Sequence, residues 1–451
     1  MEFLPTSNEL IVKRVVELVP GVLYWAAVDI GLYSNYLRSN KVAAVSKPTI
    51  KSNVPPKGIL KAPFRKEESY ATENIDSNIT PQKSRRTSFV EKPIMMTPAT
   101  TRVVFTDRVF VYRPLGKDFG PLDLPTTYRY IDFLDEQFSL GAVVVHVSDC
   151  RKPHLCANSA YLASVYSVVR FGLSPAEVGA KLRPVSSTLI PPFRDASMNT
   201  RNTFPLSIEQ CCASIQQAVE RGWMDWENFD VARFEYLQHV DNGDLNWIFE
   251  NKFLAFAGPS TDCLDEDGLE VHAPAHYVEL FTKMGVTDVV RLNVPNYDAS
   301  EFSSHGIQHH ELLFEDGSCP SVKLVNFFLE IADQAKGPVA VHCKAGLGRS
   351  GCMIGLWAMR HMRISAQTFI AWARIARPGS VLGPQQHFLL EMQHMLWNRS
   401  SGRILRGTAG LASKGSQSPV GRHGDLGQGS RLLKQKRRAA KVAIPPFAAS
   451  C

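Results

Sequence analysis

Two segments of this chain share one pattern, in which an apolar, strand-like run is followed by a loop and a helix. The first copy reads AVVVHVSDCRKPHLCANSAYLASVYSVV, and the second reads PVAVHCKAGLGRSGCMIGLWAMRHM. An uninterrupted apolar run of this length is typical of a strand buried on both faces, as in a parallel sheet. The copies align at their histidines, His146 and His342. In this alignment Cys343 faces a valine and Arg349 faces a proline, so only the second copy carries a thiol and a cation at these two positions.

The rest of the chain alternates strand-like and helix-like runs, which indicates an α/β fold. Further buried strands are expected at FLAFAGP and VTDVVRLN, and a connecting helix is expected at FDVARFEYLQHV. A chain of 451 residues is too long for one compact core. We predict a chemically degenerate N-terminal domain (1–228), a linker helix (229–241) and a second domain that carries the chemistry (242–398).

Two segments lack the apolar periodicity of a folded domain, and both are predicted to be disordered. An insert at about 39–100 is rich in Pro, Lys, Ser and Thr, and its Thr-Pro pairs are candidate kinase sites. The tail, 399–451, holds eleven Lys and Arg residues against one acid, within a net charge of +7. It is also rich in Gly and Ser and cannot bury enough surface to offset the entropy of ordering. Its cluster RLLKQKRRAAK fits recognition by a nuclear import receptor, by nucleic acid or by microtubules, or simple solvation of the tail.

The cysteines and the N-terminal residues bear on the compartment. Nine cysteines, an odd number without a CxxC pair or zinc-like spacing, indicate free thiols in a reducing compartment. The stretch MEFLPTSNEL is acidic and interrupted, unlike a signal peptide, and no apolar run approaches the roughly 20 residues of a membrane helix. We expect a soluble protein of the nucleus and cytoplasm, without membrane contact.

The loop after Cys343 has the composition of an anion site with a nucleophile at its base. A thiol attacks only as the thiolate, so positive potential around it must lower its pKa. The glycines of the loop let successive backbone N–H groups and the N-terminus of the next helix point at one centre. Arg349 adds a planar fork suited to two phosphate oxygens, and Ser350 can donate a hydrogen bond to the sulfur. The loop therefore predicts a phosphate cradle, whereas a buried structural cysteine in a tight turn is the alternative.

Two further segments can complete a hydrolytic mechanism. Attack on phosphorus expels an alkoxide or phenoxide, which near neutral pH needs a proton from a general acid. Asp316, in FEDGSCP, lies 27 residues before Cys343 in a turn-rich segment that can form a movable loop, although Asp-Gly is also an ordinary turn pair. In RPGSVLGPQQHFL, the amides of Gln385 and Gln386 can orient a hydrolytic water or simply hold the loop.

The string HCKAGLGRSG resembles the signature loop of cysteine-dependent protein phosphatases. Other motifs follow the order found in the cell-division-cycle dual-specificity phosphatases of mitotic exit, namely DFGPLDL, PPFRDAS, NGDLNWI, KFLAFAGP, VVRLN, FEDGS and RPGSVLGPQQHFL. The resemblance covers roughly residues 11 to 398, except the insert. It implies two tandem dual-specificity-phosphatase-like domains joined by a linker helix, the first of them catalytically degenerate.

The resemblance also implies roles for individual residues. Cys343 is the expected nucleophile, Arg349 binds the phosphate and Asp316 is the general acid. Ser350, Gln385 and Gln386 assist, with serine in place of the family's usual threonine. The expected phosphate site is the backbone of Lys344, Ala345, Gly346, Leu347, Gly348 and Arg349.

The family's preference implies substrates with phosphoserine followed by proline and a later basic residue, bound in an acidic groove between the domains. Candidates for this groove are acids near the expected domain junction, namely Asp149, Glu235, Asp241 and Asp244. Phosphothreonine and phosphotyrosine are further expected substrates. We expect the basic tail to deliver the protein to the nucleus or spindle, with the nucleolus or centrosome as further locations.

Other functions remain open at this stage. An inositol-lipid phosphatase usually carries a second lysine where this chain has Leu347, and an RNA triphosphatase is favoured only by the basic tail. A non-catalytic scaffold that binds phosphopeptides or microtubules is the alternative of a different class. Neither a metal nor another cofactor is expected, because the arginine and the backbone amides supply the positive charge.

Overall fold

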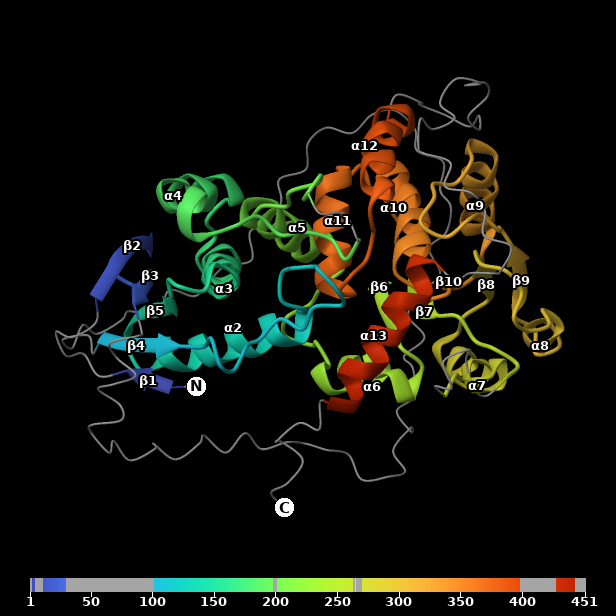
Figure 1. Cartoon of the computed structure of the whole chain (residues 1–451), viewed down its shortest axis with the longest axis horizontal. Helices are drawn as coiled ribbons and strands as arrows, with labels where there is room; N and C mark the ends of the chain where they lie inside the picture. The colour runs from blue at the N-terminus through green and yellow to red at the C-terminus, as the bar shows by residue number, and fades with distance from the viewer. Residues whose placement is uncertain are drawn as a thin grey trace, which may run out of the picture.

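The computed structural model describes residues 2–4, 11–29, 101–197, 201–262, 264, 270–397 and 427–442. These residues form two five-stranded sheets, each packed against helices, at opposite ends of an elongated molecule (Figure 1). The predicted α/β class with two related units is therefore confirmed. The predicted insert at 39–100 lies outside the described residues. No helix within the described ranges is long and apolar enough to cross a membrane.

The first sheet has the strand order β1-β4-β5-β3-β2. Its central strand β5 (Val143–Asp149) runs parallel to both neighbours, and the outer pairs are antiparallel. The other strands are β1 (Glu2–Leu4), β2 (Ile11–Val19), β3 (Leu23–Asp29) and β4 (Thr101–Phe105). The helices are α2 (Leu124–Ser139), α3 (Pro153–Phe171), α4 (Pro175–Leu189) and α5 (Ile208–Glu220).

The second sheet has the order β6-β7-β10-β8-β9, and its central strand is β10 (Val339–Cys343), parallel to β7 and β8. The other strands are β6 (Leu245–Phe249), β7 (Phe253–Ala257), β8 (Asp288–Arg291) and β9 (Gln308–Glu311). The helices are α7 (Pro274–Met284), α8 (Ser300–Ser303), α9 (Val322–Gln334), α10 (Gly348–Met362), α11 (Ala366–Ala376) and α12 (Pro384–Trp397).

Both faces of β10 are covered, which explains its continuous apolar sequence. Successive side chains of a strand point to opposite faces. Val339 and Val341 accordingly join the core built with α9 and α10, whereas Ala340 packs in the cluster formed with α7. Burying the strand on both sides fixes the position of Cys343 at its end.

A short helix, α6 (Val231–Gln238), and a turn of 3-10 helix at Val240–Asn242 lead from the first unit into the second. The Asp230 side chain caps α6 by accepting a hydrogen bond from the N–H of Arg233 at 2.8 Å. α6 lies within the range predicted for the linker helix, and the domain limits themselves stay predictions.

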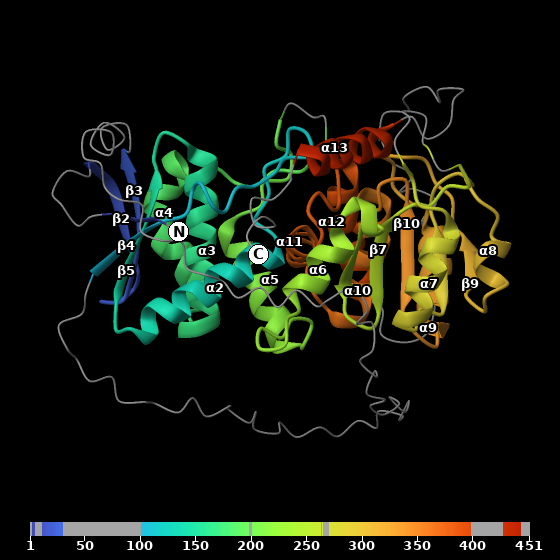
Figure 2. The same ribbon diagram turned by 90° about the horizontal axis from the view of Figure 1, so that it is seen from below.

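The two units share one hydrophobic core, through α5 of the first and α11 of the second, which lie side by side in Figure 2. Trp223, just after α5, packs its ring against Phe249 and Trp372, with centroid distances of 4.9 and 5.9 Å. The Trp372 indole N–H donates to the Ile248 carbonyl at 2.7 Å. The junction is therefore a packed interface of aromatic side chains.

One prediction about the tail is wrong. Gln428–Val442 form a helix, α13, which lies across the second domain, against the 3-10 turn at Val240–Asn242 and the end of β7 (Figures 1 and 2). The sequence argument weighed the charges of this cluster, whereas Leu432 and Leu433 are both buried. Burial of these leucines against a complementary surface contributes to ordering a segment that has no core of its own. The rest of the predicted tail, 399–426 and 443–451, lies outside the described residues.

Candidate active site

Cys343 is the last residue of β10 and is almost fully buried, with 3% of its surface exposed. The loop that follows turns back over the strand ends before α10 begins at Gly348. Gly346 has φ of +64°, and a Cβ there would lie 1.9 Å from the Phe256 carbonyl oxygen. Only glycine fits at this point, so the sequence pattern of the loop follows from its closeness to β7.

Arg349 lies in the first turn of α10 and joins the cysteine loop to the segment that carries Asp316. Its Nη1 donates to the carbonyls of Phe314 and Leu292 at 3.1 and 3.3 Å. Its Nη2 is 3.4 Å from Asp316 Oδ1. The structure thus brings the predicted nucleophile, phosphate ligand and general acid to one edge of the second sheet, where β10 and β8 end. The chemical roles of these residues stay predictions.

The two predicted glutamines lie in different surroundings. Gln385 accepts a hydrogen bond from the N–H of Leu382 at 3.3 Å and donates to the Ser318 carbonyl at 3.1 Å. A Cβ at Gly348 would be 2.9 Å from Gln385 Oε1, so this amide lies against the cysteine loop. Gln386 instead accepts from Arg374 and donates to the Gly383 carbonyl. Gln385 is therefore the member of the pair that lies against the cysteine loop, and its role toward water stays a prediction.

Ser350 is fully buried in α10, directly after Arg349. Its hydroxyl has no hydrogen-bond partner among the described residues. The predicted hydrogen bond from Ser350 to the Cys343 sulfur is thus not formed in this structure.

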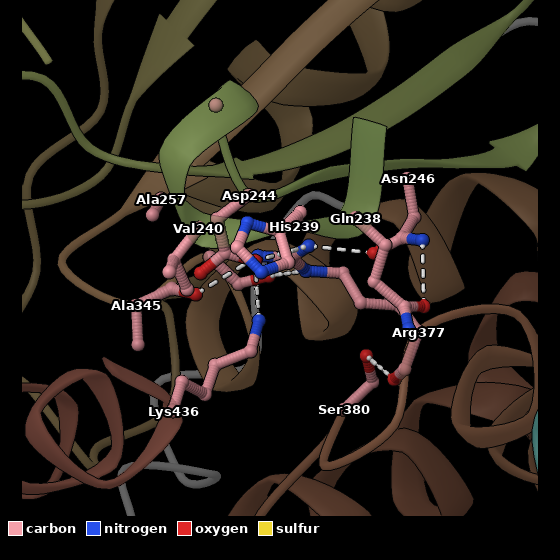
Figure 3. A network of polar contacts seen from close by, with 12 residues as sticks. Gln238, His239, Val240, Asp244, Asn246, Ala257, Ala345, Arg377, Ser380 and Lys436 are labelled. Atoms are coloured by element: carbon pink, nitrogen blue, oxygen red, sulfur yellow. Dashed lines mark hydrogen bonds and ion pairs between the residues drawn. The ribbon is translucent and has the colours of Figure 1, made fainter. Parts of the chain in front are cut away.

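Arg377, which the sequence argument missed, supports the loop from behind. Its Nε donates to the Gly346 carbonyl at 2.7 Å and its Nη2 to the Ala345 carbonyl at 3.1 Å. Its Nη1 donates to Asn246 Oδ1 at 2.7 Å and pairs with Asp244 Oδ1 at 3.0 Å (Figure 3). Arg377 thus fixes two carbonyls of the loop whose N–H groups are expected to bind the anion. The only signal in the sequence was an arginine before a Pro-Gly pair.

A second buried network holds the carbonyl of Cys343. The His342 Nδ1 is 3.2 Å from that oxygen, and its Nε2 is 2.6 Å from the Tyr297 hydroxyl. Burial lowers the pKa of His342 to about 3, so the ring is neutral. If Nδ1–H donates to the carbonyl, then Tyr297 donates to Nε2 and accepts from His309 Nε2, which is 2.9 Å away. One set of tautomers therefore satisfies the whole chain of contacts.

Among the predicted groove acids, only Asp244 lies at the site. It is 2% exposed, adopts φ of +46° and pairs with both Arg377 and Lys436 of α13. Glu235 instead pairs with Arg129 on the surface, and Asp241 is an exposed side chain beside His239. The structure does not gather the four acids into one groove, because three of them have partners or solvent elsewhere.

Asp149, the fourth candidate, ends β5 in the first domain, at the position that matches the start of the cysteine loop in the second. There the Asp107 carboxylate accepts hydrogen bonds from the Ser148 hydroxyl at 2.8 Å and the Asp149 N–H at 2.9 Å. Burial raises the pKa of Asp107 to about 6. A buried carboxylate therefore binds the end of β5 in the first domain, and the catalytic degeneracy of this domain stays a prediction.

The loop before α12 also contacts the first domain. Asp195 Oδ2 accepts a hydrogen bond from the Gly383 N–H at 2.7 Å, just before the two glutamines.

Within the described ranges, no cluster of three or more His, Cys, Asp or Glu side chains is arranged to hold a metal ion.

A buried cysteine at the end of a parallel strand, a glycine loop, and an arginine that reaches a carboxylate are the defining parts of a cysteine-dependent phosphatase site. Comparison with known proteins agrees. The model of the N-terminal half of dual specificity protein phosphatases matches residues 86–218, and the dual specificity phosphatase catalytic domain matches 272–395. The chain belongs to the dual specificity phosphatases, in the group of the CDC14 proteins.

Three relatives illustrate the similarity. The chain is 43% identical over 305 residues to Dual specificity protein phosphatase CDC14AB of Danio rerio. The matched residues cover 66% of this chain and 49% of that protein. It is 42% identical over 294 residues to CDC14A of Homo sapiens, with 64% and 49% covered. It is 35% identical over 338 residues to Tyrosine-protein phosphatase cdc-14 of Caenorhabditis elegans, with 73% and 48% covered. The chain therefore spans about half the length of these relatives.

Proposed function

We propose that this chain is a metal-independent protein phosphatase that works through a phosphocysteine intermediate. The observation that carries the proposal is the 3.4 Å contact between Arg349 and Asp316. This contact places the proposed proton donor beside the arginine that would bind the phosphate, next to the cysteine loop. The names of the relatives, dual specificity and tyrosine-protein phosphatases, agree with phosphoprotein substrates.

The proposed reaction has two steps. The Cys343 thiolate attacks phosphorus and forms an S–P bond, while the P–O bond to the substrate breaks and Asp316 protonates the leaving oxygen. Arg349 and the loop N–H groups hold the other phosphate oxygens throughout. Water oriented by Gln385 then attacks phosphorus, the Asp316 carboxylate takes its proton, and the S–P bond breaks to release phosphate and the thiolate. The intermediate therefore needs no group from outside the chain other than water.

We further propose a preference for phosphoserine followed by proline and a basic residue, with activity toward phosphothreonine and phosphotyrosine. Asp244 supports the preference for a basic residue in the substrate, since its carboxylate already pairs with cationic side chains beside the cysteine loop. Such sites are made by cyclin-dependent kinases, so the protein would reverse their phosphorylation during cell division. We propose the nucleus and cytoplasm as its location, with the spindle or centrosome as sites of action.

The test is hydrolysis of a pSer-Pro-x-Lys peptide, compared with pThr-Pro and pTyr peptides, in buffer with a chelator. We expect the wild type to release phosphate from all three and fastest from the first, and Cys343→Ser to release none. Cys352→Ser is a matched control, because Cys352 is a fully buried thiol on α10 outside the site. Tight peptide binding without turnover by the wild type would instead favour a non-catalytic scaffold that binds phosphopeptides.

A further inference from the structure

The two glutamines lie at the start of α12, and the first domain contacts the chain on both sides of them. Before the pair, the Gly383 N–H donates to Asp195 Oδ2 at 2.7 Å. Asp195 is 5% exposed, so water competes little for this hydrogen bond. After the pair, the Phe204 ring meets the His387 ring edge-on, with centroids 5.9 Å apart. The position of the glutamines therefore depends on side chains of the other domain.

The backbone around Asp195 is held in place within the first domain. Arg194 and Phe119 exchange two backbone hydrogen bonds, at 2.7 and 3.2 Å. Phe193 and Leu206 exchange two more, at 2.8 and 3.1 Å. The Phe193 ring is fully buried and packs on Phe119, with centroids 5.1 Å apart. A carboxylate that directly follows these pairs is a fixed acceptor, because its backbone has little freedom to move.

Gln385 follows Gly383 by two residues, and its side chain faces the segment of the expected general acid. The side-chain nitrogen donates to the Ser318 carbonyl at 3.1 Å. Ser318 lies two residues after Asp316. Pro384 separates Gly383 from Gln385, and its ring restricts the backbone between them. A shift of Gly383 would therefore move the Gln385 amide relative to the general acid.

Arg374 holds the other side of the loop before α12. It is buried, and it donates to the carbonyls of Ser380 and Val381 at 3.2 and 3.0 Å. Burial lowers the pKa of Arg374, and the charge of Asp195 opposes this shift, so the two groups attract each other. The loop thus lies between an arginine of its own domain and a carboxylate of the other.

We propose that Asp195 is a positioning residue for the second step of the reaction, in which water cleaves the phosphocysteine. The inference rests on the proposed phosphatase function. In that step the water oxygen bonds to phosphorus as the S–P bond breaks, its proton passes to the Asp316 carboxylate, and the Cys343 thiolate is released. The first step has no water to orient. Loss of the Asp195 carboxylate should therefore slow hydrolysis of the intermediate and leave its formation unchanged.

The first test is stopped-flow hydrolysis of p-nitrophenyl phosphate by the full chain. Nitrophenolate leaves readily, so a burst reports formation of the intermediate and the linear phase reports its hydrolysis. In Asp195→Ala we expect a burst rate within about twofold of the wild type and a linear rate at least about tenfold lower. Asp195→Asn keeps an oxygen that can accept from Gly383, so it should restore most of the lost rate.

The matched control for this test is Asp132→Ala, which makes the same change at an exposed position of α2 in the first domain. Both of its rates should equal those of the wild type. An unchanged linear rate in Asp195→Ala, or an Asp195→Asn protein as slow as Asp195→Ala, would overturn the proposal.

A double-mutant cycle shows whether Asp195 acts through the glutamine. Gln385→Ala should also slow the linear phase. Adding Asp195→Ala to Gln385→Ala should slow it by no more than about a further twofold, because residues that act through one another are not additive. Losses that multiply in full would assign Asp195 a role independent of Gln385 and contradict the proposal.

Hydrogen exchange of residues 380–386, measured by mass spectrometry without substrate, tests the contact independently of turnover. We expect faster exchange in Asp195→Ala than in the wild type or Asp132→Ala. A wild type without turnover would refute the proposed function, while faster exchange in Asp195→Ala would still support its hold on the loop. Normal turnover by the wild type, with unchanged exchange in Asp195→Ala, would refute the positioning role and keep the function.

Discussion

At the scale of single residues, Arg377 shows that the phosphate loop depends on a group outside its own motif. One guanidinium contacts two carbonyls of the loop and also the side chains of Asn246 and Asp244. A lysine can replace only one of these contacts. We expect Arg377→Lys to lower kcat/KM by about tenfold to a hundredfold, or ~1.4 to 2.8 kcal/mol of transition-state stabilisation. Steady-state kinetics on the phosphopeptides measures this effect.

The same kinetic measurement distinguishes a role of Arg377 in positioning the loop from a general loss of folding in the variant. The loss should fall mainly on kcat, because the loop amides stabilise the transition state more than the bound substrate. Arg183→Lys, on the exposed side of α4, is the control and should leave both constants unchanged. A stable Arg377→Lys protein with wild-type kcat would show that the loop keeps its shape unaided.

Asp107 gives a prediction about pH. Its pKa rises to about 6 in the folded chain, from roughly 3.9 in an unfolded chain, chiefly because it is buried beside Asp149. The folded state then binds more protons between these values, so stability falls as pH rises from about 4 to 6, by at most ~3 kcal/mol. Ser148, Lys152 and Cys156 also face this carboxylate, and none of them changes the sign.

Urea unfolding at pH 4, 5 and 6 tests this dependence. In Asp107→Asn the contribution should disappear, because the amide can still accept from the Asp149 N–H but does not ionise. A slope with pH that persists in Asp107→Asn would assign the effect to another group.

At the scale of elements, the parts with strong local patterns were predictable and the parts made by distant contacts were not. β10 and the loop before α10 follow from one apolar run and three glycines. α13 was missed because burial of Leu432 and Leu433 depends on a surface built from both domains. Three of the four groove acids were misplaced for a similar reason, since the position of Glu235 is set by its pairing with Arg129 and not by its place in the chain.

Gly346 tests how far the loop depends on its closeness to β7. Alanine there would combine a positive φ with a 1.9 Å contact to the Phe256 carbonyl, so the loop must move. We expect Gly346→Ala to lower kcat/KM at least about a hundredfold. Gly306→Ala is the matched control, because Gly306 has φ of +80° with no atom within 4 Å of the added Cβ, and it should cost only about 1 kcal/mol of stability. Similar activities for the two variants would mean that the contact with Phe256 is easily relieved.

At the scale of the whole molecule, two sheets that the sequence presents as separate units share one core. Periodicity and motifs indicate each unit by itself, but they do not show that α5 packs on α11 or that Asp195 caps the N–H of Gly383 in the other domain. The first domain therefore supports the segment that carries Gln385. This arrangement explains how a copy without a nucleophile contributes to the site.

The shared core predicts that the two domains unfold together, and Trp223 is the place to test it. Its ring contacts Phe249 and Trp372 across the junction, and Arg221 adds a hydrogen bond to the Met362 carbonyl. We expect one calorimetric transition for the wild type, whereas Trp223→Ala should lose about 2 to 4 kcal/mol and split the transition in two. Tyr236→Ala, at an exposed aromatic of α6, should keep the single transition. Two transitions already in the wild type would mean that the domains fold independently and that the interface only orients them.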